Sequence, residues 1–126
     1  MSDDAIERGV AVRRRIAGDE TVDRELANLS EFDRPFYDLV TTACFADVWG
    51  REDLDPKIRA LITVAICGAL ARPGALNNHI RNALRHGATK EELREVALHI
   101  GIYAGVPAGG QTMGAIKDIL KETGAL

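Results

Sequence analysis

The residue whose type and position most strongly suggest chemistry is His79, because imidazole exchanges a proton near neutral pH. Apolar residues such as Leu76 and Ile80 share its face of a predicted helix, so the side chain is expected to point inward or into a cleft. A buried structural histidine and a catalytic one fit this pattern about equally well. Asn77 and Asn78 lie directly before it, and this group of hydrogen-bonding side chains favours a site.

Glu95 is the carboxylate best spaced to work with His79, since it lies in the second helix of a predicted helical hairpin. A carboxylate in this position would orient the imidazole, fix its tautomer and raise its pKa. Glu95 also precedes His99 by four residues, and Glu92 extends the same polar stripe. A surface salt bridge is therefore the competing interpretation, and we favour it for Glu92.

Two arginines, Arg51 and Arg59, lie near the start of a strongly apolar predicted helix. An arginine at the edge of an apolar region needs a carboxylate partner, which is supplied by the protein or by a ligand. Asp47, Asp53 and Asp55 are close enough in sequence to be that partner. The arginines are thus candidates for a substrate clamp, with an internal ion pair as the alternative.

Other patterns predict no metal or nucleotide site. Cys44 and Cys67 lie on separate predicted helices without C-x-x-C spacing, so neither zinc binding nor a dithiol redox centre is expected. The glycine-rich segment 105–110 precedes a helix and could receive an anion. Tight helix packing is the commoner use of such glycines, and no phosphate-binding fingerprint accompanies them.

The composition describes an ordinary globular protein of 126 residues, 46% hydrophobic and 28% charged, with a net charge of -3. This length suits a single domain over residues 1–126. The acidic balance argues against a nucleic-acid partner, and the strongly apolar uncharged run of residues 60–71 is too short for a membrane span. We therefore expect a cytoplasmic protein with neither a nucleic-acid nor a membrane partner.

Helical periodicity recurs along the whole chain, and no alternating pattern indicates a strand. The predicted fold is all-α, a compact bundle of about six to seven helices. The helix from Asp55 onward is apolar on every side after Arg59, so a second subunit is the natural cover for one face and a homo-oligomer follows. A capping-box-like spacing at Ser30-Glu31-Phe32-Asp33 opens a helix that reaches about Val48. The other expected helices cover 4–17, 19–28 (a helix or an ordered loop), 56–71, 75–86, 90–103 and 108–123.

A combination of motifs resembles the carboxymuconolactone decarboxylase family over nearly the whole chain. The residues that carry it are Trp49-x-Arg51-x-x-Leu54 with Arg59, His79 with Ala83-Leu84 and Gly87, Thr89-x-Glu91-Glu92-x-x-Glu95, and Tyr103-x-Gly105-x-Pro107-Ala108. The resemblance implies an alkylhydroperoxidase D-like all-α fold, usually assembled as a ring of three or six subunits. The thiol pair of those peroxidases is missing here, since residues 72–76 contain no cysteine.

The resemblance also implies a reaction, the loss of a carboxylate from an anionic, carboxylated unsaturated lactone such as 4-carboxymuconolactone in aromatic catabolism, without a cofactor or metal. His79, assisted by Glu95, would supply the proton. The substrate-binding roles would fall to Trp49, Arg51, Arg59, Asn78, Tyr103 and Gln111. Arginine would clamp a carboxylate, an amide would donate to the enolate oxygen, and the aromatic rings would exclude water.

Two departures from the family pattern bear on the substrate. The segment before His79 reads Pro-Gly-Ala-Leu-Asn-Asn where the decarboxylases are rich in glutamate, and Gln111 stands where they tend to show a histidine. The scaffold could therefore serve another cofactor-free acid-base reaction, such as a cyclisation or an isomerisation in a biosynthetic pathway. A non-catalytic oligomeric binding protein is the third hypothesis, from a different class of function.

Overall fold

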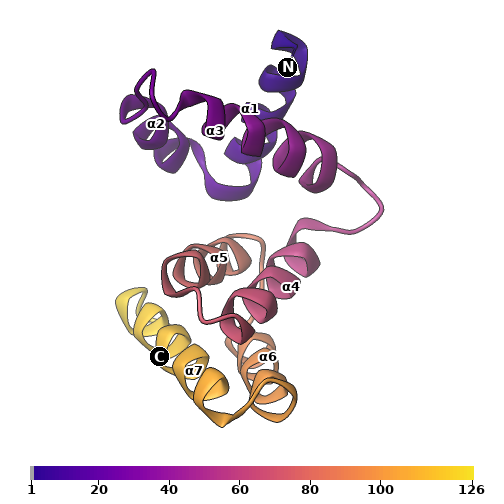
Figure 1. The fold of residues 1–126 in the computed structure, drawn as a ribbon. Helices are drawn as coiled ribbons and strands as arrows, with labels where there is room; N and C mark the ends of the chain where they lie inside the picture. The colour runs from indigo at the N-terminus through magenta and orange to yellow at the C-terminus, as the bar shows by residue number, and fades with distance from the viewer. Residues whose placement is uncertain (1) are drawn as a thin grey trace. The chain divides into compact units, whose positions relative to one another are not determined.

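The computed structural model describes residues 2–126, and all regular structure in this range is helical (Figure 1). Close contacts divide the chain into two compact units, one up to Leu54 and one over Asp55–Leu126. The elements are α1 (Asp3–Ala17), α2 (Asp19–Ala27), α3 (Arg34–Leu39), the π-helix η1 (Val40–Trp49), α4 (Pro56–Ala69), α5 (Pro73–Arg85), α6 (Lys90–Tyr103) and α7 (Val106–Glu122). The all-α prediction is confirmed for the described residues. The prediction of a single domain stays a prediction.

The first unit is built on α1 and η1, which pack against each other. A Cβ atom at Gly9 would collide with the backbone carbonyl of Thr41, so glycine sets how closely these two helices approach. Gly18 ends α1 with a φ of 89°, a backbone conformation that glycine adopts freely. The chain then turns directly into α2, and Ile16 and Val22 from the two sides of this turn are fully buried.

The segment after α3 departs from the expected regular helix. The sequence predicts one helix to about Val48, whereas Val40–Trp49 is wound as a π-helix. The amide of Gly50 donates to the carbonyl of Phe45, five residues earlier, at 2.8 Å. Apolar spacing over ten residues does not distinguish this wider winding from an α-helix, so the sequence pattern alone could not reveal it.

The second unit contains α4 to α7, and its helix starts follow local sequence signals. Asp55 caps α4 by accepting a hydrogen bond from the amide of Ile58 at 3.0 Å. Thr89 and Glu92 form the predicted capping box of α6, with bonds of 3.0 and 2.9 Å. Glu92 also accepts a bond from Lys57 at 3.0 Å, so the cap of α6 is tied to α4.

Two helices of the second unit begin earlier than predicted, and proline is the reason. α5 starts at Pro73 rather than residue 75, and α7 starts at Val106 rather than Ala108. In each case the proline occupies the first turn, where its missing amide hydrogen costs nothing. The Pro73 and Pro107 signals were interpreted as helix breaks, although each also opens the helix that follows.

Side chains from all four helices form the core of the second unit, and Val64, Ile80, Leu93 and Ile116 are almost completely buried. Helices α6 and α7 lie side by side (Figure 1). A Cβ atom at Gly109 would lie 2.6 Å from the Cα of Gly101. This contact confirms close helix packing as a role of the glycine-rich segment. No helix within residues 2–126 has both the length and the apolarity needed to cross a bilayer.

Candidate active site

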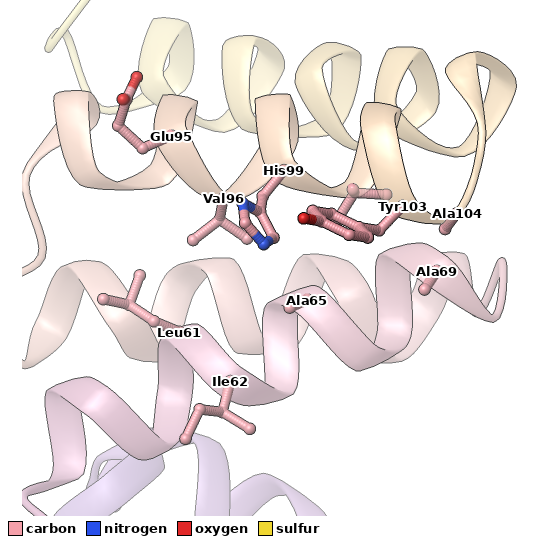
Figure 2. Close-up of a pocket in the computed structure, with 10 residues that line it drawn as sticks. Leu61, Ile62, Ala65, Ala69, Glu95, Val96, His99, Tyr103 and Ala104 are labelled. Carbon is pink, nitrogen blue, oxygen red and sulfur yellow. The ribbon is translucent and has the colours of Figure 1, made fainter.

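The largest cleft described in the second unit lies between α4 and α6 and has a volume of about 590 Å³. We call it the α4–α6 cleft. Its walls are mostly aliphatic, and its polar groups all come from α6 (Figure 2). The lining residues are Leu61, Ile62, Ala65 and Ala69 from α4, Glu95, Val96, His99, Ile100 and Tyr103 from α6, and the adjoining Ala104. Such a cleft can hold an apolar body next to a proton-transferring group.

His99 and Tyr103 extend from α6 toward α4, whereas the Glu95 carboxylate points away from α4 (Figure 2). The rings of His99 and Tyr103 lie 4.7 Å apart between centroids, inclined by 31°. Glu95 forms an ion pair with Arg94 at 3.6 Å, and both side chains are more than half exposed. The cleft therefore offers an imidazole and a phenol to a ligand, and Glu95 lies at its rim.

His79 lies on α5 and is half-buried. The amide nitrogen of Asn82 lies 3.5 Å from its Nδ1 atom. Burial lowers the pKa of His79, because the charged imidazolium loses more hydration than the neutral ring. A carboxylate partner was predicted to raise this pKa, and that direction was wrong. Desolvation is the cause of this shift, and the Glu95 carboxylate is exposed and pairs with Arg94.

Other predicted site residues of the second unit are distributed over several surfaces. Tyr103 lines the α4–α6 cleft, while Asn78 is exposed on α5 and Arg59 is half-buried near the start of α4. Gln111 lines a second cleft, of about 470 Å³, between the start of α5 and α7. The structure thus brings Glu95 and Tyr103 to one cleft and assigns Gln111 to another.

The remaining two predicted residues, Trp49 and Arg51, belong to the first unit. Trp49 is buried and stacks on Phe45 with ring centroids 6.3 Å apart, and its carbonyl accepts a bond from Arg15 at 3.2 Å. Arg51 pairs with Asp53 at 3.0 Å, and both side chains are exposed. The internal pair that the sequence offered as an alternative to a substrate clamp is therefore present for Arg51.

His99 was not among the residues predicted to form the site, although it lines the α4–α6 cleft. The available signal was the spacing of Glu95, His99 and Tyr103, which places one polar or aromatic group on the same helix face at every fourth residue. What the sequence could not indicate is that α4 presents small and aliphatic side chains opposite this face. The polar stripe of α6 therefore lines a cleft, whereas an ordinary surface stripe faces bulk solvent.

Residues 2–126 contain neither a group of metal ligands nor an activated thiol. Within residues 2–126, no three His, Cys, Asp or Glu side chains are grouped so that they could hold a metal ion. Burial raises the pKa of both Cys44 and Cys67, because the thiolate is poorly solvated in their surroundings. Neither cysteine is therefore poised as a thiolate nucleophile.

Comparison with known proteins gives these features a context. The family model described as "Carboxymuconolactone decarboxylase family" matches residues 34–118. The chain belongs to this family, as its motifs suggested. The match spans the π-helix, the two clefts described above and α7 as far as Asp118.

Two curated relatives carry decarboxylase names. The 4-carboxymuconolactone decarboxylase of Acinetobacter baylyi is 35% identical over 117 residues, which cover 93% of this chain and 87% of that protein. A nitrosuccinic acid decarboxylase of Metarhizium robertsii is also 35% identical, over 102 residues that cover 81% of this chain and 71% of the relative. The chain therefore belongs to a family with decarboxylase members. The two relatives are named for different substrates, so the substrate of this chain is left open.

Proposed function

We propose that this protein is a cofactor-independent decarboxylase for a small anionic substrate, in the first place a carboxylated unsaturated lactone such as 4-carboxymuconolactone. The observation that carries the proposal is the α4–α6 cleft, an aliphatic cavity with an imidazole along one edge, in a chain of this family. The names of the two relatives extend the range to nitrosuccinate. Both compounds are dicarboxylates that contain an electron-accepting group.

The chemistry requires the carbon–carboxylate bond to break so that carbon dioxide leaves and its electron pair stays on the substrate. In the lactone these electrons spread onto the carbonyl oxygen as an enolate, and a proton then returns to carbon. An aliphatic wall favours this step, because the charge of a carboxylate becomes more dispersed as the bond breaks. His99 is the proposed proton donor, and the hydroxyl of Tyr103 is the proposed partner of the enolate oxygen.

His79 remains the second candidate for the proton donor. Its lowered pKa means that the ring is mostly neutral in the free protein at neutral pH. An anionic substrate bound close by would favour the protonated ring, so the proton would be taken up on binding. Separate variants of the two histidines decide between them.

Arg59 is the proposed clamp for a substrate carboxylate. It precedes Ile62 by three residues on α4, and Ile62 lines the cleft, so the two side chains occupy neighbouring positions on the helix surface. Its replacement by methionine should raise KM for a dianionic substrate more than it lowers kcat. Trp49, Arg51 and Asn78 keep the substrate-binding roles that the resemblance implies, as proposals, whereas Gln111 lines the other cleft and is not assigned to this substrate.

The decisive experiment follows carbon dioxide release from 4-carboxymuconolactone and from nitrosuccinate. His99→Ala and His79→Ala are compared with His86→Ala, a histidine at the end of α5 outside the cleft. Loss of one general acid should lower kcat by about 10²–10⁴-fold, while His86→Ala stays near the wild-type rate. Wild-type protein that releases no carbon dioxide from either compound would contradict the proposal.

The same assay also tests the two alternative functions, another acid-base reaction and a non-catalytic binding protein. Conversion of the substrate without carbon dioxide release would indicate a cyclisation or an isomerisation. Binding without any conversion would indicate a non-catalytic binding protein. A homo-oligomer of three or six copies stays part of the proposal.

A further inference from the structure

The second cleft, which we call the α5–α7 cleft, contains one cation and one anion that are not neutralised by the protein. Arg72 and Asp118 both line it. Within residues 2–126, neither side chain forms an ion pair, with the other or with any third residue. The two groups come from different elements, Arg72 from the segment before α5 and Asp118 from α7, so both charges are available to a ligand.

Small residues of α7, Gly114 and Ala115, also line the cleft. Gln111, Gly114, Ala115 and Asp118 occupy one face of α7, at spacings of three and four residues. A Cβ atom added at Gly114 would meet no atom within 4 Å. The space above Gly114 is therefore open, and a ligand can approach the helix backbone at this point.

Two amide side chains line the same cleft. Asn77 on α5 and Gln111 on α7 both line the cleft, and each amide can donate and accept hydrogen bonds. The cleft thus combines a guanidinium, a carboxylate and two amides, in a volume of about 470 Å³. This set of groups is complementary to a molecule that carries both charges itself.

We infer that the α5–α7 cleft binds a small zwitterion of the amino-acid class, with its carboxylate toward Arg72 and its ammonium group toward Asp118. A guanidinium matches the planar fork of a carboxylate, and a carboxylate accepts from an ammonium group. Asn77 and Gln111 would hydrogen-bond the polar edges of the ligand between these ends.

The same charges argue against the proposed decarboxylase substrate as the occupant. A dicarboxylate would place one negative group near Asp118, and like charges at close range are unfavourable. The α5–α7 cleft also shares no lining residue with the α4–α6 cleft. It is therefore a second site, and this inference does not depend on the decarboxylase proposal.

A matched pair of glycine variants tests the site. Gly114→Leu places a side chain in the open space of the cleft, whereas Gly110→Leu places the same side chain in open space on α7 outside the lining. Both changes replace a helical glycine by a good helix former, so each is expected to preserve folding. Thermal unfolding of the full chain is then measured with millimolar L-alanine, β-alanine or 4-aminobutanoate, a series in which the two charges are progressively further apart.

At least one of these zwitterions should raise the melting temperature of the wild-type protein, because a ligand that binds only the folded state stabilises it. Gly110→Leu should keep this shift, and Gly114→Leu should lose it. Succinate and putrescine, which carry only one kind of charge, should produce no comparable shift. An equal shift in Gly114→Leu, an equal shift with succinate, or no shift with any zwitterion would overturn the inference.

Charge variants then locate the two ends of the ligand. Arg72→Gln and Asp118→Asn should each raise the dissociation constant of the stabilising zwitterion by about tenfold to a hundredfold, the usual effect of losing a hydrogen bond to a charged group. Arg85→Gln, at the opposite end of α5 and outside the lining, is the control. Unchanged affinity in both cleft variants would overturn the assignment, while decarboxylase activity measured on the same proteins reports separately on the α4–α6 cleft.

Discussion

His79 is half-buried on α5, and burial holds the pKa of its imidazole below the ordinary value of 6.5. This shift has a consequence for stability. The unfolded chain, with the ordinary pKa, takes up a proton more readily than the folded protein as the pH falls. The contribution of His79 to stability should therefore be constant above about pH 6.5 and should decrease as the pH falls below it.

Replacing His79 by glutamine should remove that dependence, because glutamine does not titrate. Urea unfolding of both proteins between about pH 5 and about pH 8 measures the difference. The free energy of unfolding of wild-type protein should fall more steeply on acidification than that of His79→Gln. Parallel curves over the whole range would contradict the lowered pKa.

The buried side chain of Arg13 contacts residues from three other helices of the first unit. Its side chain is about nine-tenths buried. Its Nε atom donates to Thr41 at 2.9 Å, its Nη1 atom pairs with Glu25 at 3.2 Å, and its guanidinium lies 4.0 Å from the ring centre of Tyr37 and 4.4 Å from that of Phe45. One side chain therefore connects α1, α2, α3 and η1.

Replacing Arg13 by methionine should destabilise the protein by about 2–4 kcal/mol. The change leaves Thr41 and Glu25 without their buried donor and removes two cation–π contacts. Arg8→Met, at an exposed position of the same helix, should change stability by no more than about 0.5 kcal/mol. Chemical unfolding measures both variants, and equal effects would show that Arg13 acts only as a surface charge.

At the scale of the helices, neighbouring glycines of α7 have different roles. A Cβ atom at Gly109 would lie 2.6 Å from the Cα of Gly101 and 2.8 Å from its amide nitrogen, while one at Gly110 would meet nothing within 4 Å. Backbone atoms cannot move aside as a flexible side chain can. The spacing between α6 and α7 therefore depends on Gly109.

Alanine substitutions at these two positions should have opposite effects. Gly109→Ala should destabilise the protein by about 1–3 kcal/mol, because α6 and α7 must separate. Gly110→Ala should stabilise it by about 0.5–1 kcal/mol, since alanine restricts the unfolded chain and favours the helix. Thermal unfolding compares the two, and a stabilising Gly109→Ala would contradict the close packing.

The sequence predicted helix caps better than it predicted side-chain partners. Asp55 and Thr89 act through neighbouring residues, so their spacing was sufficient to identify them. The partners of Glu95 depend on how its helix is rotated relative to other helices, and a hairpin pattern does not define that rotation. The π-helix after α3 was missed for a similar reason, because its spacing of apolar residues is compatible with either winding.

At the scale of the whole molecule, the family and the helical class could be predicted from motifs spread along the chain, whereas the clefts could not. A cleft forms where side chains from separate helices leave space, as at Gly114. Gln111 and Tyr103 were both predicted to bind the substrate, but they line different clefts. Their separation follows from the arrangement of α4, α5, α6 and α7 in three dimensions.

An apolar stripe on α4 carries the prediction of a homo-oligomer. Ile62, Ile66 and Leu70 recur at every fourth residue and are 46, 52 and 60% exposed. Aliphatic side chains in such a row are a typical subunit contact.

If a second copy covers the stripe, Ile66→Glu should reduce the molar mass measured by light scattering and leave the helical circular dichroism unchanged. Ala75→Glu, at an exposed position of α5, should keep the wild-type mass. A wild-type protein that is already monomeric at micromolar concentration, or an Ile66→Glu variant with unchanged mass, would contradict this role of the stripe.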